Sequence, residues 1–154
     1  CALRDGFRSF DKIDLTLQLA SLSCDDMLRL VQGKLSMSSE DLISCVDWEK
    51  SKQGFPEGSR ACEFFRAFIM EADETESFRL LRWCTGLAAL PAQGMIDDKI
   101  CLEWDGIESG VASRYPVAHA CTRQIDLPNY TSLDVLRARI QQALLEENDG
   151  FYER

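Results

Sequence analysis

The sequence predicts an α+β fold in which helices surround a small sheet, and three observations carry this prediction. Several segments repeat apolar residues every three to four positions behind a capping residue, as amphipathic helices do. Residues 99–104 form a short run typical of a strand. A chain of 154 residues has the length of about one domain and suffices for a buried core.

The expected helices begin at capping residues and several end at stop signals. Ser23 opens a helix that Gly33 ends, and a short helix follows Ser39. Three longer helices are expected at residues 59–72, 74–85 and 132–147, with Ser59, Asp73 and Thr131-Ser132 as their caps and Gly86 as the stop of the second. The sheet is expected to contain residues 99–104 and the region around Cys121, with Cys121, Arg123 and Ile125 on one face of a strand.

Residues 49–58 interrupt the helical pattern. Glu49-Lys-Ser-Lys-Gln-Gly-Phe-Pro-Glu-Gly58 is polar, contains two glycines and a proline, and has no apolar periodicity. Two interpretations stay open from the residues alone: a hinge between two units, and a surface loop within one unit.

Charge argues against several kinds of partner. The net charge is −9, with acidic residues spread along the chain rather than gathered in a tail. A protein that binds nucleic acid or an anionic membrane usually presents a basic face, and none is visible. We therefore expect neither nucleic acid nor membrane as a partner. The chain starts at Cys1 without a signal pattern, and we expect it to be part of a longer protein.

The cysteines indicate a reduced, intracellular protein. Seven cysteines lie about twenty residues apart without a Cys-x-x-Cys pair, and the chain has one histidine. Most lie in or beside apolar stretches, where cysteine acts as a small hydrophobic residue. We expect no disulfide framework, no metal and no cofactor, and a cytoplasmic or nuclear location.

Cys121 is the exception, because it follows the only histidine, His119, by two residues. A cysteine nucleophile needs a nearby cation, imidazole or hydrogen-bond donor, and in an extended segment His119, Cys121 and Arg123 point the same way. Pro116 and Pro128 flank the segment. An ordinary core cysteine on a strand remains the alternative at this point.

The wider segment resembles the active site of HECT-type ubiquitin ligases. Tyr115-Pro-Val-Ala-His-Ala-Cys121 is similar to the family's Leu-Pro-x-Ala-His-Thr-Cys run, and Leu127-Pro-Asn-Tyr-Thr-Ser132 to its following Leu-Pro-x-Tyr-Ser-Ser. Leu80-Leu-Arg-Trp-Cys-Thr-Gly86 resembles another family segment, and Phe151 stands fourth from the C-terminus, where the family has a phenylalanine. These motifs recur in the family's order over nearly the whole chain.

The resemblance implies a transferase that works through a cysteine thioester. Cys121 is expected to accept ubiquitin from a ubiquitin-conjugating enzyme and pass it to a lysine of a protein substrate. His119 is expected to orient the loop or tune the thiol, and Phe151 to position ubiquitin or substrate for the second step. Thr122 and Arg123 are expected to contact the substrate.

The resemblance also implies a division of the chain. Residues 1–50 are expected to be the mainly helical end of the family's N-terminal lobe, exposing apolar surface which that lobe covers. Residues 51–58 are the expected hinge, and residues 59–154 the mobile lobe that carries the cysteine. Most of the surface that recruits the conjugating enzyme lies outside this chain on this interpretation.

The sequence departs from the family pattern beside the cysteine. Ala120 stands where the family has threonine, and Thr122-Arg123 where it has Phe-Asn. Loss of one positioned donor costs on the order of 100-fold in rate, and Arg123 offers a compensating cation. An active ligase is the favoured interpretation, and a HECT-like binding module with weakened or lost chemistry is the alternative. A cysteine hydrolase is weaker, because the sequence identifies no acid that orients His119.

Overall fold

The structure is a computed structural model that describes residues 22–150, with side chains described as far as Glu146. In chain order its elements are α3 (Cys24–Gln32), α4 (Ser39–Ser44), α5 (Trp48–Gln53), α6 (Ala61–Glu71), α7 (Glu74–Thr85), β1 (Cys101–Trp104), the 3-10 helix η1 (Val111–Ser113), β2 (Val117–His119), β3 (Gln124–Leu127) and α8 (Leu133–Gly150). The α+β class is confirmed, and helices α6, α7 and α8 match the three long expected helices within three residues at each end.

Local capping explains where the helices begin and end. The Ser23 hydroxyl accepts a hydrogen bond from the Asp26 amide, and the Asp26 carboxylate accepts one from the Ser23 amide. Asp73 accepts from the amide of Glu76 at the start of α7, and Gly86 ends that helix in the left-handed conformation. Ser59 lies one residue before the N-cap of α6, but its hydroxyl still accepts from the Ala61 amide.

The three strands form a mixed sheet in the order β1-β3-β2. β1 runs parallel to β3, and β2 pairs with β3 in antiparallel register. Because neighbouring residues in a strand alternate between faces, Leu102, Ile125 and Leu127 share one face, and all three are fully buried. Gln124 and Asp126 lie on the opposite face.

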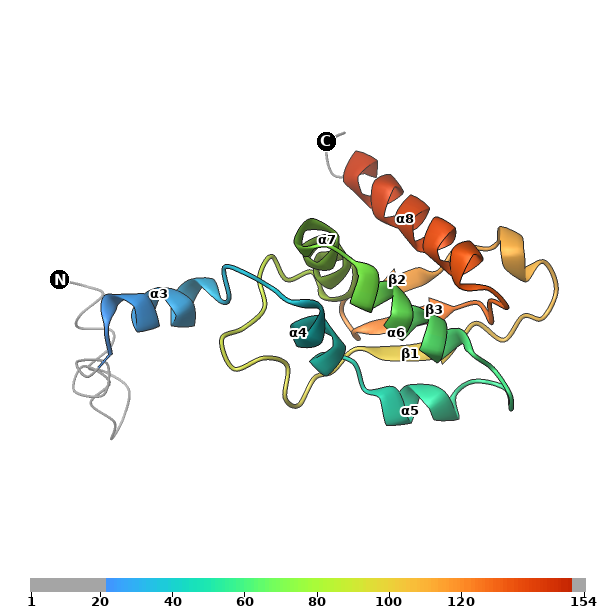
Figure 1. Cartoon of the computed structure of the whole chain (residues 1–154), viewed down its shortest axis with the longest axis horizontal. Coiled ribbons are helices and arrows are strands. Elements are labelled where there is room, and N and C mark those ends of the chain that lie inside the picture. The colour runs from blue at the N-terminus through green and yellow to red at the C-terminus, as the bar shows by residue number, and fades with distance from the viewer. Residues whose placement is uncertain (1–21, 151–154) are drawn as a thin grey trace.

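The buried face of the sheet packs against helices. Figure 1 shows α6, α7 and α8 on one side of the strands, and buried side chains of these helices share one core with the sheet, among them Phe65, Leu81 and Ile140. This arrangement leaves the opposite face, next to the β2–β3 connection, available for polar groups.

Residues 48–53 are helical, which corrects the expectation of an irregular segment there. The side chain of Asp47 caps α5, and Ser51 is fully buried against β1. The Ser51 hydroxyl donates to the carbonyl of Asp47 at 2.5 Å and accepts from the amide of Leu102 at 2.9 Å. The helix is short and has no apolar stripe. This contact with the sheet is therefore what stabilises it.

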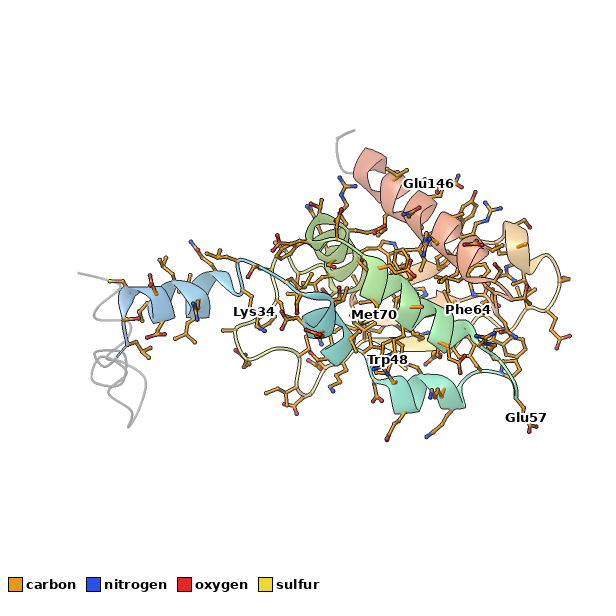
Figure 2. The ribbon with its side chains drawn as sticks, in the orientation of Figure 1. Lys34, Trp48, Glu57, Phe64, Met70 and Glu146 are labelled. Carbon is orange, nitrogen blue, oxygen red and sulfur yellow. The ribbon has the colours of Figure 1, made fainter. Side chains whose placement is uncertain are left out.

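The core also includes the segment before α5. Leu42 and Val46 are buried in it, and Val46 forms an isolated parallel bridge with Ile100. The side chain of Trp48, the first residue of α5, packs toward α6 (Figure 2): its indole nitrogen donates to the carbonyl of Ile43 at 2.9 Å, and its ring centroid lies 6.5 Å from that of Phe65. Residues from Met37 onward therefore pack with the later elements. The expected boundary at residues 51–58 stays a prediction.

Helix α3 contributes no buried residue and projects from one end of the molecule (Figure 1). Its apolar side chains Leu28, Leu30 and Val31 are exposed, as expected for a segment that lacks a covering partner. It joins the rest through Gly33, which has a φ of +79° and lies so close to the Leu90 carbonyl that a side chain would collide with it. Residues 1–21 of the expected N-terminal segment lie outside the described residues.

No helix within residues 22–150 combines the length and apolar character that crossing a bilayer requires.

The packing of α5 predicts that Ser51→Ala destabilises the protein by about 1–3 kcal/mol, because the buried Leu102 amide loses its acceptor. Urea unfolding followed by circular dichroism measures the change. Ser44→Ala is the matched control: its hydroxyl also donates to a backbone carbonyl, but Ser44 is exposed, so a loss below about 0.5 kcal/mol is expected. Equal effects of the two substitutions would show that α5 does not dock on β1.

Candidate active site

Cys121 lies in the turn of a β-hairpin. β2 ends at His119, β3 begins at Gln124, and these two residues face each other in the antiparallel register. Residues 120–123 connect them, and the Cys121 side chain is exposed. The expectation that Cys121, Arg123 and Ile125 share one face of a strand is therefore wrong, because the chain reverses direction at this point.

The backbone of the turn explains the reversal. The amide of Thr122 donates to the carbonyl of His119 at 3.1 Å, which closes a four-residue turn around Ala120 and Cys121. Arg123 then adopts a φ of +53°, the only positive φ of a non-glycine residue among those the structure describes. A left-handed residue after such a turn realigns the chain with the next strand. Cys121 is thereby presented at the tip of the hairpin.

Two contacts hold Arg123 in this strained conformation. Its carbonyl accepts from the amide of Cys101 at 2.9 Å, at the start of the parallel β1–β3 ladder. Its guanidinium lies 2.6 Å from a carboxylate oxygen of Asp98. The Arg123 guanidinium, which the sequence suggested as a cation for the thiol, is thus paired with Asp98 in the segment before β1.

The two ends of the hairpin are tied to each other. Pro116 before β2 and Pro128 after β3 are buried. Tyr130 is fully buried, and its hydroxyl donates to the carbonyl of Arg114 at 2.7 Å. Burial raises the pKa of the Tyr130 phenol well above its usual range, so the hydroxyl keeps its proton and remains a donor. These contacts fix where the hairpin leaves and re-enters the fold.

His119 pairs with Asp126 across the hairpin. Its Nε2 lies 3.0 Å from Asp126 Oδ2, and Gln124 Nε2 donates to Asp126 Oδ1 at 2.8 Å. Burial opposes the charge on Asp126, but the hydrogen bonds from Gln124 and His119 outweigh it and lower the pKa of the carboxyl. Asp126 is the acid for His119 that the sequence did not identify. Recognising the hairpin would have revealed it, because residues 119, 124 and 126 then fall on one face.

The buried cysteines differ from Cys121. Cys45, Cys62, Cys84 and Cys101 are buried, as expected of small hydrophobic residues. Burial raises the pKa of Cys45, and it raises that of Cys62 to about 11, which keeps these two as thiols. Cys24 on α3 is exposed, although the sequence places it beside an apolar stretch. It thus serves as an internal reference for the reactivity of Cys121.

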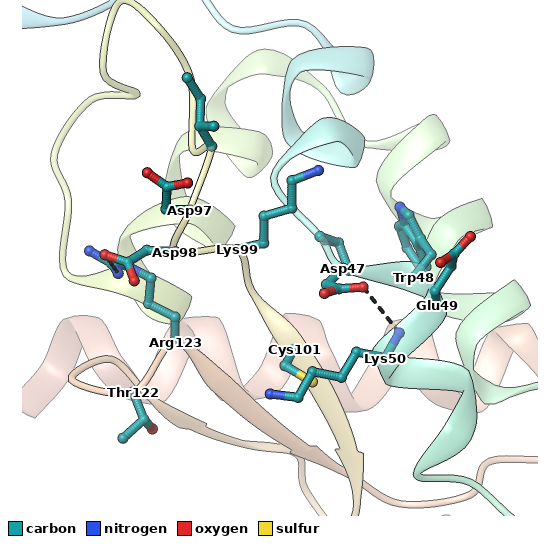
Figure 3. Close-up of a pocket in the computed structure, with 12 residues that line it drawn as sticks. Asp47, Trp48, Glu49, Lys50, Asp97, Asp98, Lys99, Cys101, Thr122 and Arg123 are labelled. Atoms are coloured by element: carbon teal, nitrogen blue, oxygen red, sulfur yellow. Dashed lines mark hydrogen bonds and ion pairs between the residues drawn. The ribbon is translucent and has the colours of Figure 1, made fainter.

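A groove of about 730 Å³ adjoins the turn on the side of Thr122 and Arg123. Figure 3 shows its other walls, which come from the start of α5 and from residues 96–99, with Asp98 against Arg123. The lining carries both signs of charge, from Asp47, Glu49, Asp97, Asp98, Lys50, Lys99 and Arg123. Thr122 and Arg123, the two residues that follow Cys121, thus line a polar groove.

The described side chains contain no cluster of three or more histidine, cysteine or carboxylate residues arranged to hold a metal ion.

The comparison with protein families identifies the family of the chain. The model of the HECT-domain (ubiquitin-transferase) family matches residues 1–153. The chain belongs to the HECT-domain family. Its expected membership, drawn from the ordered motifs around Cys121, is confirmed.

Curated relatives of this HECT-family chain are ubiquitin ligases by name. The chain is 29% identical over 152 residues to the "Bifunctional serine/threonine-protein kinase/NEDD4-like E3 ubiquitin-protein ligase" of Dictyostelium discoideum, covering 97% of this chain and 7% of that protein. It is 27% identical to the "E3 ubiquitin-protein ligase RSP5" of Saccharomyces cerevisiae, covering 97% of this chain and 18% of that protein. "E3 ubiquitin-protein ligase hecw-1" of Caenorhabditis elegans is 28% identical, covering 89% and 11% respectively. The chain thus spans less than a fifth of the length of these relatives.

The structure brings two of the HECT motifs together. The segment Leu80–Gly86 forms the end of α7, and a Cβ placed on Gly86 would lie 4.0 Å from the Cβ of Ala120 in the turn. The motif glycine therefore borders the cysteine-bearing turn. Phe151, the third family feature, lies outside the described residues.

The left-handed backbone conformation of Arg123 leads to the prediction that a substitution at this position can stabilise the protein. In an Asp98→Ala background, where the ion pair is absent, Arg123→Asn is expected to stabilise the protein by about 0.5–1 kcal/mol, because asparagine adopts this conformation at lower cost. Urea unfolding measures the difference. Thr122→Asn in the same background is the control and is expected not to stabilise. Destabilisation by Arg123→Asn would contradict the turn conformation.

Proposed function

We propose that Cys121 accepts ubiquitin as a thioester and passes it to a substrate lysine. The observation that carries this proposal is the exposed cysteine at the tip of an anchored hairpin, in a chain that belongs to the HECT-domain family. The names of the relatives support the reaction class. The partners of this reaction are ubiquitin, a ubiquitin-conjugating enzyme and a protein substrate, and the location is the cytoplasm, the nucleus or both.

The chemistry has two steps. The Cys121 sulfur attacks the carbonyl carbon of the thioester that joins ubiquitin to the conjugating enzyme, the old C–S bond breaks, and the departing thiolate of that enzyme takes up the proton lost by Cys121. A neutral substrate amine then attacks the new thioester, the C–S bond to Cys121 breaks, an isopeptide bond forms, and the proton lost by the amine passes to the Cys121 thiolate. A cysteine suits both steps, because a thioester exchanges with a thiol and still reacts with an amine.

The neighbours of Cys121 divide the remaining roles. His119 orients the turn, since its carbonyl accepts hydrogen bonds from both the amide and the hydroxyl of Thr122. Thr122 and Arg123 contact the bound protein where they border the groove. Phe151 positions ubiquitin or substrate for the second step.

The chain's role as a mobile lobe is part of the same proposal. Helices α4 and α5 pack with the later elements. This packing favours a hinge between the two lobes before Met37, near Gly33, over the expected hinge at residues 51–58. The exposed apolar side chains of α3 then belong to the preceding lobe.

A catalytically weakened binding module is the second candidate. Two observations favour it: the Thr122 hydroxyl donates to the His119 carbonyl, and the Arg123 guanidinium pairs with Asp98. Neither replaces the hydroxyl that Ala120 lacks. A binding module retains the fold and its partner surface but forms no thioester.

The proposal predicts that the chain forms an adduct with ubiquitin that a reducing agent removes. Ubiquitin carrying a small thiol as a C-terminal thioester serves as the donor, so that no conjugating enzyme is needed. Gels run with and without reducing agent measure the adduct. Cys121→Ala is expected to abolish it and Cys24→Ala to leave it unchanged. Absence of the adduct in the wild type, or its persistence in Cys121→Ala, refutes the proposal and favours the binding module.

The role given to Phe151 predicts that the two steps separate. Removal of residues 151–154 is expected to leave thioester formation intact and to slow transfer to a lysine, because the nucleophile is retained and the acceptor is less well positioned. Single-turnover assays of loading and discharge measure the two rates. An equal loss in both steps would contradict this role.

A further inference from the structure

The register of the sheet gathers a polar group of three side chains behind the turn. His119 faces Gln124 in the β2–β3 pairing, and Asp126 lies two residues further along β3 on the same face. That face is opposite to the one that carries Leu102, Ile125 and Leu127 into the core, although Cys101, which pairs with Gln124, is also buried on it. His119 is about half exposed, at 46% of its side chain, so an incoming molecule can reach the ring.

The hydrogen bonds of this group determine which nitrogen of His119 carries a proton. Gln124 donates to one oxygen of Asp126, and His119 Nε2 meets the other at 3.0 Å. These contacts favour the ionised carboxylate, which only accepts hydrogen bonds. Nε2 therefore carries the hydrogen, and in the neutral ring Nδ1 keeps a free lone pair.

We propose that Asp126 is a positioning residue that holds His119 as the proton acceptor for the amine that discharges the Cys121 thioester. The inference rests on the proposed function, because it assigns a role in the second step of that reaction. A lysine is mostly an ammonium ion near neutral pH and must lose a proton to attack. His119 precedes Cys121 by two residues at the start of the turn, and Nδ1 is the ring nitrogen that Asp126 does not contact.

The charges around His119 suit this role. Asp126 on β3 accepts from the ring, and Glu103 on β1 lies beside Asp126 on the same face. Helix α7, which packs against β2, has Arg82 in its last turn, and Arg123 in the turn is paired with Asp98. The nearest carboxylate is thus placed to stabilise the imidazolium that forms when His119 takes up a proton.

The step balances without a further reactant. The lysine ammonium first gives one proton to His119 Nδ1, and the neutral amine then attacks the thioester carbonyl carbon. The C–S bond breaks, its electron pair leaves on the Cys121 sulfur, and the second proton lost by the nitrogen passes to this thiolate. The imidazolium releases its proton to water, which restores the neutral ring.

The experiment separates this role from a structural one by comparing two nucleophiles. The chain is loaded with the small-thiol thioester of ubiquitin and then discharged with free lysine or with hydroxylamine, which is already neutral at pH 7 and needs no help to lose a proton before attack. Asp126→Asn is expected to load within about twofold of the wild type. Its discharge to lysine is expected to fall at least about tenfold, within the roughly 100-fold that general base catalysis contributes, while its discharge to hydroxylamine is retained.

Three further variants complete the test. Glu103→Gln removes a neighbouring carboxylate without touching the ring's partner and is expected to behave as the wild type. Asp126→Glu is expected to restore part of the lysine reaction. His119→Asn, at a half-exposed position, is expected to show the same selective loss as Asp126→Asn and serves if the latter does not fold.

The outcomes separate the role of Asp126 from the proposed thioester function of Cys121. Wild-type discharge to lysine in both Asp126→Asn and His119→Asn overturns the inference. Equal loss with both nucleophiles also overturns it and leaves a role only in the shape of the turn. Failure of the wild type to form any adduct overturns the proposed function itself.

Discussion

The parallel pairing of β1 with β3 is the constraint on which the site depends. The first bond of this ladder, from the Cys101 amide to the Arg123 carbonyl, ends the turn that presents Cys121. β1 is itself held by Ser51 of α5 on one side and by the core beneath Leu102 on the other. The position of an exposed thiol is therefore set by contacts made deep in the fold, as expected when reactive groups lie on loops carried by rigid elements.

The two faces of the sheet have different roles: one packs in the core and the other carries polar side chains next to the cysteine-bearing turn. One face carries Leu102, Ile125 and Leu127 into the core, and the other carries the His119, Gln124 and Asp126 side chains. Because the strand period is two, the same four residues of β3 serve both purposes. Because of this division, the His119, Gln124 and Asp126 side chains can lie next to the cysteine-bearing turn without entering the core.

Local signals predicted the helices, and non-local contacts account for what was missed. Ser23, Asp73 and Gly86 act within a turn of their own position, so their caps were readable from the sequence. Helix α5 was missed because a buried hydrogen bond to Leu102, fifty-one residues away, stabilises a polar stretch. The hairpin turn was missed because arginine is not a residue that signals a left-handed conformation. The pairing of Asp126 with His119 was missed for the same reason, because only the chain reversal at Arg123 brings these two residues together.

The central claim is that this turn presents one ubiquitin-accepting thiol. Ubiquitin with an electrophile in place of its C-terminal carboxylate tests it most directly, with the modified site identified by peptide mass spectrometry. The account predicts labelling at Cys121 and not at Cys24, the other exposed cysteine in the described part of the chain. Labelling of both cysteines to the same extent, or of neither, would contradict it.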